Sequence, residues 1–173
     1  MSMTLQTERL ILRRPEPGDW GAFRAFMLSD RSSLLGSTQD VGKAWRAFAA
    51  ELGHWEIRGY GMWAVTLRGD NDAVGLVGPW TPDDWPETEI GWMLFGETTQ
   101  GTGVAFEAAK AAIAHAFDAL NWATAVSYIA PENTRSVKLA EKLGAKLDIH
   151  AKVPNPDEPC LVYRHPDPAG ARR

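Results

Sequence analysis

The sequence predicts an α+β domain: a mostly antiparallel sheet with one parallel pair of strands and flanking helices. Segments with strand character outnumber helical ones along the chain. In the middle, an apolar run at residues 89–95 leads through a glycine-containing loop into a long Ala-rich segment with helical spacing. Another β-rich run, residues 124–130, follows that helix. A strand–helix–strand order of this kind favours a parallel pair inside an otherwise antiparallel sheet.

The elements before this central unit are predicted from short apolar patterns and turn residues. The expected strands cover residues 5–13, 62–67 and 73–78, and the expected helices run from Asp19, as N-cap, and over about residues 38–57. A polar turn at residues 68–72 should join the second and third of these strands into a hairpin.

The elements after the central unit carry clearer end signals. The long helix should occupy about residues 105–120. Asn133 is the expected N-cap of the next helix, and Gly144 is its expected C-terminal stop. Residues 145–153 alternate polar and apolar, as in a half-buried strand, and residues 158–165 should form the last strand. We expect one domain over residues 1–173, with a disordered tail after Pro166.

Bulk properties exclude several classes of protein. The 173 residues are 45% hydrophobic and 23% charged, as is ordinary for a globular domain. A net charge of −4 argues against a general nucleic-acid or membrane-surface partner. Cys160 is the one cysteine, which excludes an intrachain disulfide, and the four histidines lack metal-ligand spacing. With no long apolar run and no signal pattern, a cytoplasmic location is expected.

The loop between strand and helix, Gln100–Ala105, has a composition suited to phosphate. A helix start offers unpaired backbone N–H groups and the positive end of the helix dipole, and glycines let a ligand approach the backbone closely. Such a cradle needs no cation, and Lys and Arg are absent from residues 88–106. Phe106 stands where a dinucleotide fingerprint needs glycine, and no Lys follows either glycine as in a P-loop.

These residues also resemble a known family. Gln100-x-x-Gly103-x-Ala105 resembles the pyrophosphate signature of GNAT N-acyltransferases, which bind acyl-coenzyme A. Three further stretches resemble, in the same order, parts of the branch that contains the ribosomal-protein N-terminal acetyltransferases. They are its first strand at residues 7–13, its fourth strand at residues 89–94 and its final helix at Asn133-x-x-Ser136-x-x-x-x-Glu141-Lys142-Leu143-Gly144.

The resemblance implies a binding site for acetyl-CoA without a metal. The free edge of the fourth strand would pair with the pantetheine arm, and a backbone N–H near Met93 or Leu94 would stabilise the oxyanion. The cofactor-binding residues that it implies are Met93, Leu94, Phe95, Gln100, Gly101, Thr102, Gly103, Val104, Ala105, Asn133 and Ser136.

Candidate catalytic residues follow from the same alignment of motifs. Strand alternation puts Glu89 and Gly91 on one face, with room beside the carboxylate, and Glu89 is the first candidate for the base. Glu87 or a water molecule is the alternative. Many family members place a tyrosine as acid in the final helix, but this chain has Ala140 there. Ser136 stands where this branch often has a serine that faces the thiol.

Three functions remain open at this point. The first is transfer of an acetyl group from acetyl-CoA to a primary amine in a ternary complex. The second is a catalytically weak acyl-CoA-binding regulatory domain, for which the missing tyrosine is the reason, and the third is a structural domain that shares the fold. The acceptor is open among a protein N-terminus, a lysine side chain, an aminoglycoside-like antibiotic and a polyamine. Acids at residues 83–89 beside tryptophans suit a cationic amine, although a solvated hairpin explains them equally, and a homodimer is possible.

Overall fold

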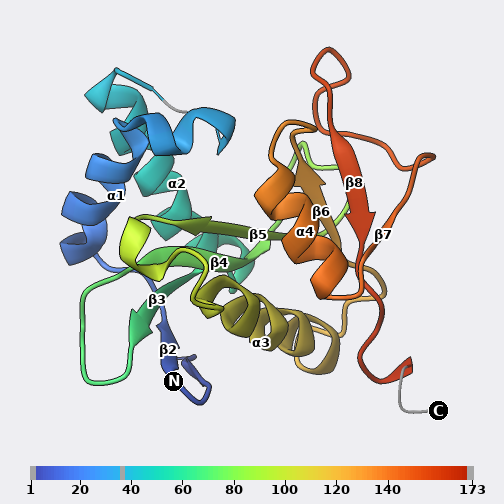
Figure 1. Ribbon diagram of the computed structural model, residues 1–173, viewed down its shortest axis with the longest axis horizontal. Helices are drawn as coiled ribbons and strands as arrows, with labels where there is room; N and C mark the ends of the chain where they lie inside the picture. The colour runs from blue at the N-terminus through green and yellow to red at the C-terminus, as the bar shows by residue number, and fades with distance from the viewer. Residues whose placement is uncertain (1–2, 36–37, 171–173) are drawn as a thin grey trace.

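The computed structural model describes residues 3–35 and 38–170, in which eight strands form a single sheet. Their order across the sheet is β1-β2-β3-β4-β5-β6-β8-β7 (Figure 1). Every neighbouring pair is antiparallel except β5 and β6, which are parallel, so the predicted mixed fold is confirmed. The strands are β1 Leu5–Gln6, β2 Leu10–Arg13, β3 Trp63–Leu67, β4 Gly75–Trp80, β5 Glu89–Leu94, β6 Val126–Ile129, β7 Lys146–Leu147 and β8 Leu161–Arg164.

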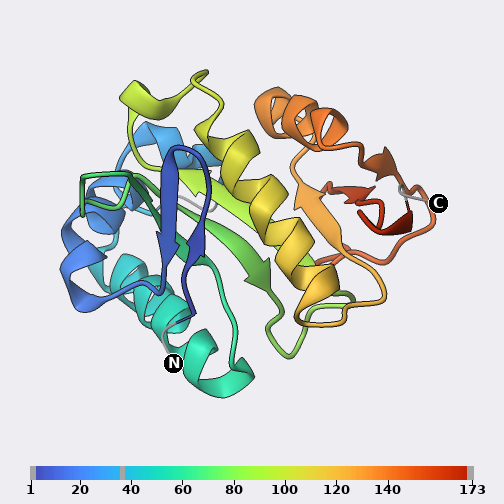
Figure 2. The same cartoon turned by 90° about the horizontal axis from the view of Figure 1, so that it is seen from below.

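Helices cover both faces of the sheet. They are α1 Trp20–Met27, α2 Val41–Arg58, α3 Val104–Asp118 and α4 Thr134–Lys142, with short 3-10 turns η1 Pro17–Asp19, η2 Asp30–Leu35 and η3 Glu97–Thr99. Helix α3 lies across one face of the sheet, and α1 and α2 lie on the other (Figure 2). Small alanines of α3 pack against Leu10, Leu12 and Val65, whereas Phe23 and Phe48 pack against Leu76 on the opposite face. None of the described helices combines the length and apolarity needed to cross a membrane.

The N-terminal segment departs from the prediction, because residues 5–13 form a hairpin of two strands, β1 and β2, rather than one strand. The turn between them contains neither Gly nor Pro. It is closed by the Thr7 N–H, which donates to Leu10 O at 3.1 Å, and it is held from outside by Glu107 of α3. A long-range contact of this kind leaves no local signal in the sequence.

Two other local predictions hold only in part. Asp19 occupies the N-cap position of α1, but its side chain makes no capping hydrogen bond, because its carboxylate accepts from Arg13 at 2.7 and 2.9 Å and from the Glu16 N–H. The strand expected over residues 145–153 is limited to Lys146–Leu147. The Asp148 N–H still donates to Val162 O of β8 at 2.8 Å, but the Asp148 carboxylate also accepts from the His150 N–H, and the chain turns there instead of continuing as a strand.

The end signals of α4 are confirmed. The Asn133 side chain accepts a hydrogen bond from the Ser136 N–H at 3.1 Å, as an N-cap does, and Gly144 has a φ of +86° just after the helix. Of the tail predicted to be disordered, residues 167–170 form a turn in which Gly170 N–H donates to Asp167 O. Residues 171–173 lie outside the described part of the chain.

Candidate active site

The site begins where β5 and β6 separate. Among the described residues their parallel pairing consists of one register pair, Glu89 with Val126. One residue further on, the Ser127 hydroxyl on β6 donates to Ile90 O at 2.6 Å and lies 2.8 Å from Nε2 of the buried His165. A side chain therefore spans the point at which the backbone ladder stops, and the remainder of β5 presents an open edge.

The direction of the amides along this edge follows from two hydrogen bonds. The Phe95 N–H points to β4, where it donates to Val74 O, and Ile90 O points to β6, where it accepts from Ser127. Because alternate residues of a strand direct their backbone groups to opposite sides, Trp92 and Leu94 direct theirs to the open gap, and Met93 directs its own to β4. Of the two oxyanion candidates, this geometry favours the Leu94 N–H over that of Met93.

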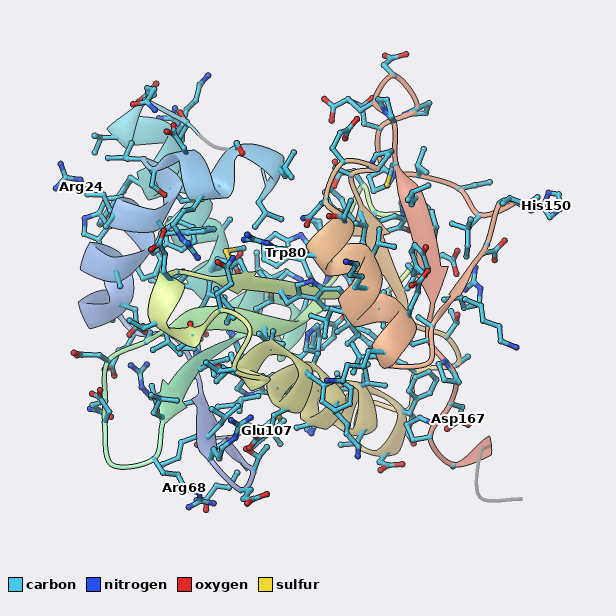
Figure 3. The ribbon with its side chains drawn as sticks, viewed as in Figure 1. Arg24, Arg68, Trp80, Glu107, His150 and Asp167 are labelled. Atoms are coloured by element: carbon cyan, nitrogen blue, oxygen red, sulfur yellow. The ribbon has the colours of Figure 1, made fainter. Side chains whose placement is uncertain are left out.

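A small cavity of about 270 Å³ lies against β5 on the side covered by α1 and α2. Glu89 and Gly91 both line it, as strand alternation predicted. A Cβ at Gly91 would lie 3.1 Å from Met62 Sδ and 3.8 Å from Glu89 Oε1, so the glycine does keep space beside the carboxylate. Trp80, which also lines the cavity, lies near the centre of the molecule in Figure 3.

The Glu89 carboxylate has the properties of a base. Its Oε2 accepts a hydrogen bond of 2.6 Å from the Trp85 indole. Burial raises the pKa of Glu89 to about 7, although the Trp85 hydrogen bond and one from the Tyr128 backbone oppose the rise. A pKa near the working pH suits a group that must accept a proton and later release it. The rival, Glu87, instead forms a two-point ion pair with Arg164 at 2.7 and 3.0 Å.

A second carboxylate, Glu51 of α2, lines the same cavity and was missed at the sequence level. Its side chain is buried, with 5% of the residue exposed, and its Oε2 has no hydrogen-bond partner among the described residues. Burial, with the charge of Glu89 adding to it, raises the pKa of Glu51 to about 8. The available signal was its place in the apolar stripe of α2, between the buried Phe48 and Trp55.

A larger groove of about 870 Å³ runs from the open end of β5 past the glycine loop to α4. Gly101 and Gly103 have φ of +74° and +85°, a conformation that favours glycine, and Gly103 is the N-cap position of α3. Most of the predicted cofactor residues line the groove: Met93, Leu94, Gln100, Gly101, Gly103, Ala105, Asn133 and Ser136.

The other three predicted cofactor residues point elsewhere. Phe95 packs on Phe23 and Phe26, with ring centroids 6.0 and 5.4 Å apart. Thr102 donates its hydroxyl to Thr99 O at 2.6 Å, and the Val104 side chain is buried in the core. These side chains shape the loop, so any contact that they make with a cofactor would come from their backbone.

The N-terminal hairpin holds the glycine loop in place through Arg9. Arg9 donates to Thr102 O at 2.9 Å and forms an ion pair with Glu107 of α3 at 2.7 Å. Glu107 also accepts from the Thr7 hydroxyl and from the Arg9 N–H. Glu107 is labelled in Figure 3, where the hairpin meets α3. The motif at residues 7–13 therefore supports the glycine loop, a role that the sequence did not indicate.

The groove also contains cations that the loop itself lacks. Arg31 of η2 and Arg135, Lys138 and Lys142 of α4 line it, beside Asp30, Glu97 and Glu132. Positive φ at both glycines, a helix N-terminus and four basic side chains fit the phosphates of coenzyme A. Sequence reasoning found the loop but not these cations, because they lie on elements distant along the chain.

Ser136 lies where the groove and the small cavity meet, since it lines both, together with Trp92, Met93 and Asn133. The Trp92 indole donates to Ser136 Oγ at 3.0 Å. This leaves the serine's own O–H free to donate into the groove. Ala140, at the position of the family tyrosine, is fully buried against Ile129, Ala145 and Tyr163 and lines neither cavity.

The splayed strands carry a groove on one side and an acidic cavity on the other, and the two meet at the open edge of β5. The chain belongs to the GNAT acetyltransferase family: residues 9–146 match the model described as "Acetyltransferase (GNAT) domain". By this membership it is an acetyl-CoA-dependent acetyltransferase.

Two solved structures share the fold of this chain, and one curated protein is similar to it in sequence. An acetyltransferase from Agrobacterium tumefaciens str. C58 is 38% identical, with a TM-score of 0.88 over 95% of this chain and 94% of that one. The uncharacterized protein YkkB of Bacillus subtilis is 28% identical over 81% of this chain and 83% of its own length. RimL, a ribosomal alpha-N-protein acetyltransferase solved in complex with coenzyme A, shares the fold at 17% identity, with a TM-score of 0.70 over 94% and 97% of the two chains.

No group of three or more His, Cys, Asp or Glu side chains suited to a metal occurs in the described residues. His54 does not line the small cavity. Its Nε2 accepts from the Thr81 N–H at 2.9 Å, so its Nδ1 carries the proton that is donated to Tyr60 O at 2.7 Å. This histidine therefore joins the end of α2 to the loop after β4.

Proposed function

We propose that the protein transfers an acetyl group from acetyl-CoA to a primary amine held in the small cavity, with both substrates bound at once. The observation that carries the proposal is that the groove and the cavity share six of the described lining residues: Leu34, Leu35, Trp92, Met93, Asn133 and Ser136. A thioester in the groove and an amine in the cavity would meet there, and holding two reactants together lowers the barrier to reaction.

The roles of the residues follow from their contacts. Bound acetyl-CoA supplies the activated acetyl group. Glu89, oriented by Trp85, accepts the proton that the amine must lose before the new C–N bond forms and the C–S bond breaks. The Leu94 N–H faces the negative charge that develops on the carbonyl oxygen. Ser136, which accepts from Trp92, donates its own proton towards the departing sulfur.

The glycine loop and α4 would together hold the phosphates of coenzyme A. The backbone of residues 101–105 would hold the pyrophosphate, and the basic side chains of α4 would approach the outer phosphate groups. The proposal places the enzyme in the cytoplasm, since Cys160, the sole cysteine, suits a reducing compartment. A protein N-terminus and a small-molecule amine both satisfy the general reaction.

A catalytically weak acyl-CoA-binding domain is the alternative, and one observation favours it. The position of the family tyrosine is filled by the buried Ala140, so proton transfer to sulfur rests on Ser136 or on water. Turnover separates the two functions, because both predict acetyl-CoA binding.

The test is a thermal shift with acetyl-CoA followed by thioester consumption over a panel of amines. Ligand at about 100 times its Kd should stabilise the fold by about 2.7 kcal/mol. For a domain of this length that is roughly 5–10 °C in Tm. A shift without turnover on any amine would favour the regulatory domain, and no shift with folded protein would contradict both functions.

A further inference from the structure

The residues that line the small cavity limit the classes of acceptor amine that can bind there. Glu51 and Glu89 are the only charged side chains among the described residues that line it; no Lys, Arg or His does. The rest of its wall is mostly aromatic, aliphatic or thioether, and includes Phe23, Trp80 and Trp85. The raised pKa keeps Glu51 protonated at neutral pH before an amine binds, and a bound ammonium group would favour its ionised form. An anionic group on the acceptor would instead meet two acidic side chains and find no cation.

Two polar atoms of the cavity wall lack partners. Glu51 Oε2 and the Tyr128 hydroxyl are both buried and make no hydrogen bond within the described residues. A buried carboxylate oxygen without a donor is costly, so such an atom on a cavity wall points to a ligand that supplies the donor. An ammonium group has three N–H donors and a positive charge, which matches Glu51, Glu89 and the Tyr128 hydroxyl as acceptors.

The size of the cavity limits what carries that ammonium. At about 270 Å³ it is slightly below the usual range of small-molecule sites. A space of this size favours a compact acceptor, such as one ring with a short aliphatic chain.

We propose that the acceptor is a compact, apolar primary amine that enters as a cation and carries no carboxylate or phosphate, with Glu51 and Glu89 together holding its ammonium group. This rests on the proposed acetyl transfer and names its substrate class. Glu51 is then a binding residue that selects against anionic amines. Glu89 keeps the separate role of accepting the proton that turns the ammonium group into the nucleophilic amine, and the second N–H proton, lost once the C–N bond has formed, goes to the departing sulfur.

A matched set of acceptors tests the proposal. Phenethylamine, phenylalanine amide, phenylalanine and a short peptide with N-terminal phenylalanine share the ring and the amine but differ in the group next to them. We expect kcat/KM for phenethylamine to exceed that for phenylalanine by at least about tenfold, or 1.4 kcal/mol. Equal or faster acetylation of phenylalanine, or of the peptide, would overturn the proposal.

The variant Glu51→Gln isolates the second carboxylate. It should raise KM for phenethylamine several-fold and reduce the discrimination against phenylalanine, with a smaller effect on kcat. Glu56→Gln is the control, because it removes the same charge from an exposed position of the same helix. If Glu51→Gln leaves KM and the discrimination unchanged, Glu51 does not hold the acceptor.

A binding measurement without acetyl-CoA tests the cavity as an amine-binding site separately from acetyl transfer. Trp80 and Trp85 line the cavity, so phenethylamine should change the intrinsic fluorescence, and the change should weaken in Glu51→Gln. Binding without turnover of any amine would contradict acetyl transfer but keep the cavity assignment. Turnover with a preference for anionic or peptide acceptors would contradict the cavity assignment alone, and neither binding nor turnover would contradict both.

Discussion

Replacing Glu51 by glutamine should stabilise the protein at alkaline pH and leave its stability near pH 5 unchanged. The pKa of Glu51 rises from 4.5 in the unfolded chain to about 8 in the fold, because the carboxylate is buried and faces the charge of Glu89. Between these two values the folded state binds more protons than the unfolded state. The free energy of unfolding therefore falls as pH rises through this window.

The magnitude follows from the width of the window. Each pH unit costs up to about 1.36 kcal/mol for one such group, so wild type loses at most about 4 kcal/mol to Glu51 between pH 5 and pH 8. The variant, which cannot ionise there, keeps that stability. For a domain of this length, 4 kcal/mol corresponds to roughly 10 °C in Tm, and any entry of water into the cavity reduces the figure.

The assay is thermal unfolding of wild type, Glu51→Gln and the exposed control Glu56→Gln over pH 5 to 8, without ligand. The difference in Tm between Glu51→Gln and wild type should increase with pH, and the Tm of the control should follow that of wild type. Parallel curves for wild type and Glu51→Gln, or a variant that loses stability at pH 8, would refute the reasoning. Either result would mean that the carboxylate is solvated or has a partner.

Three further predictions concern the reaction itself. Glu89→Gln should lower kcat/KM at neutral pH with partial recovery at higher pH, as the amine loses its proton unaided; wild-type kcat/KM from pH 6 to 9 on a confirmed acceptor would exclude Glu89 as the base. Gly103→Val should weaken acetyl-CoA binding in a calorimetric titration by more than about tenfold, or 1.4 kcal/mol. The control is Gly69→Val, which places the same side chain at a nearly equal φ of +87° in an exposed turn and should lower stability without weakening acetyl-CoA binding. Equal acetyl-CoA affinity in the two variants would mean that residues 100–105 form an ordinary turn. Ser136→Ala should lower kcat with little change in acetyl-CoA affinity, whereas a residue that merely packs against Trp92 would change Tm and not kcat.

Local patterns predicted those parts of the fold that local physics determines. The strand at residues 89–94, the glycine loop, α3 and the Asn133 cap each depend on neighbours within a few residues in the sequence, where spacing and capping act. The pairing of Glu89 and Gly91 on one face follows from strand alternation and was also predicted correctly.

Features that depend on contacts between distant segments were not predictable in this way. The turn at residues 7–9 is held by Glu107, about one hundred residues away, and the cations of the groove come from η2 and α4. The sequence shows Glu51 only as an acidic residue within the apolar stripe of α2. The structure shows that it lines the same cavity as Glu89. A stripe position identifies burial, but it does not identify what the buried group faces.

Among the described residues, the junction between β5 and β6 has the fewest backbone hydrogen bonds in the centre of the sheet, and the Ser127 hydroxyl supplies a side-chain bond across it. Four antiparallel register pairs join β6 to β8, and six join β4 to β5, whereas β5 and β6 share one pair and the Ser127 bridge. A single such bridge contributes about 1 kcal/mol, far less than a full ladder. Side chains also cross this junction, since Arg164 of β8 pairs with Glu87 and Trp92 of β5 donates to Ser136, so we expect the backbone to open locally there while the two halves of the sheet stay together. Hydrogen exchange would detect this opening as faster exchange of backbone amides at the junction of β5 and β6 than in the rest of the sheet.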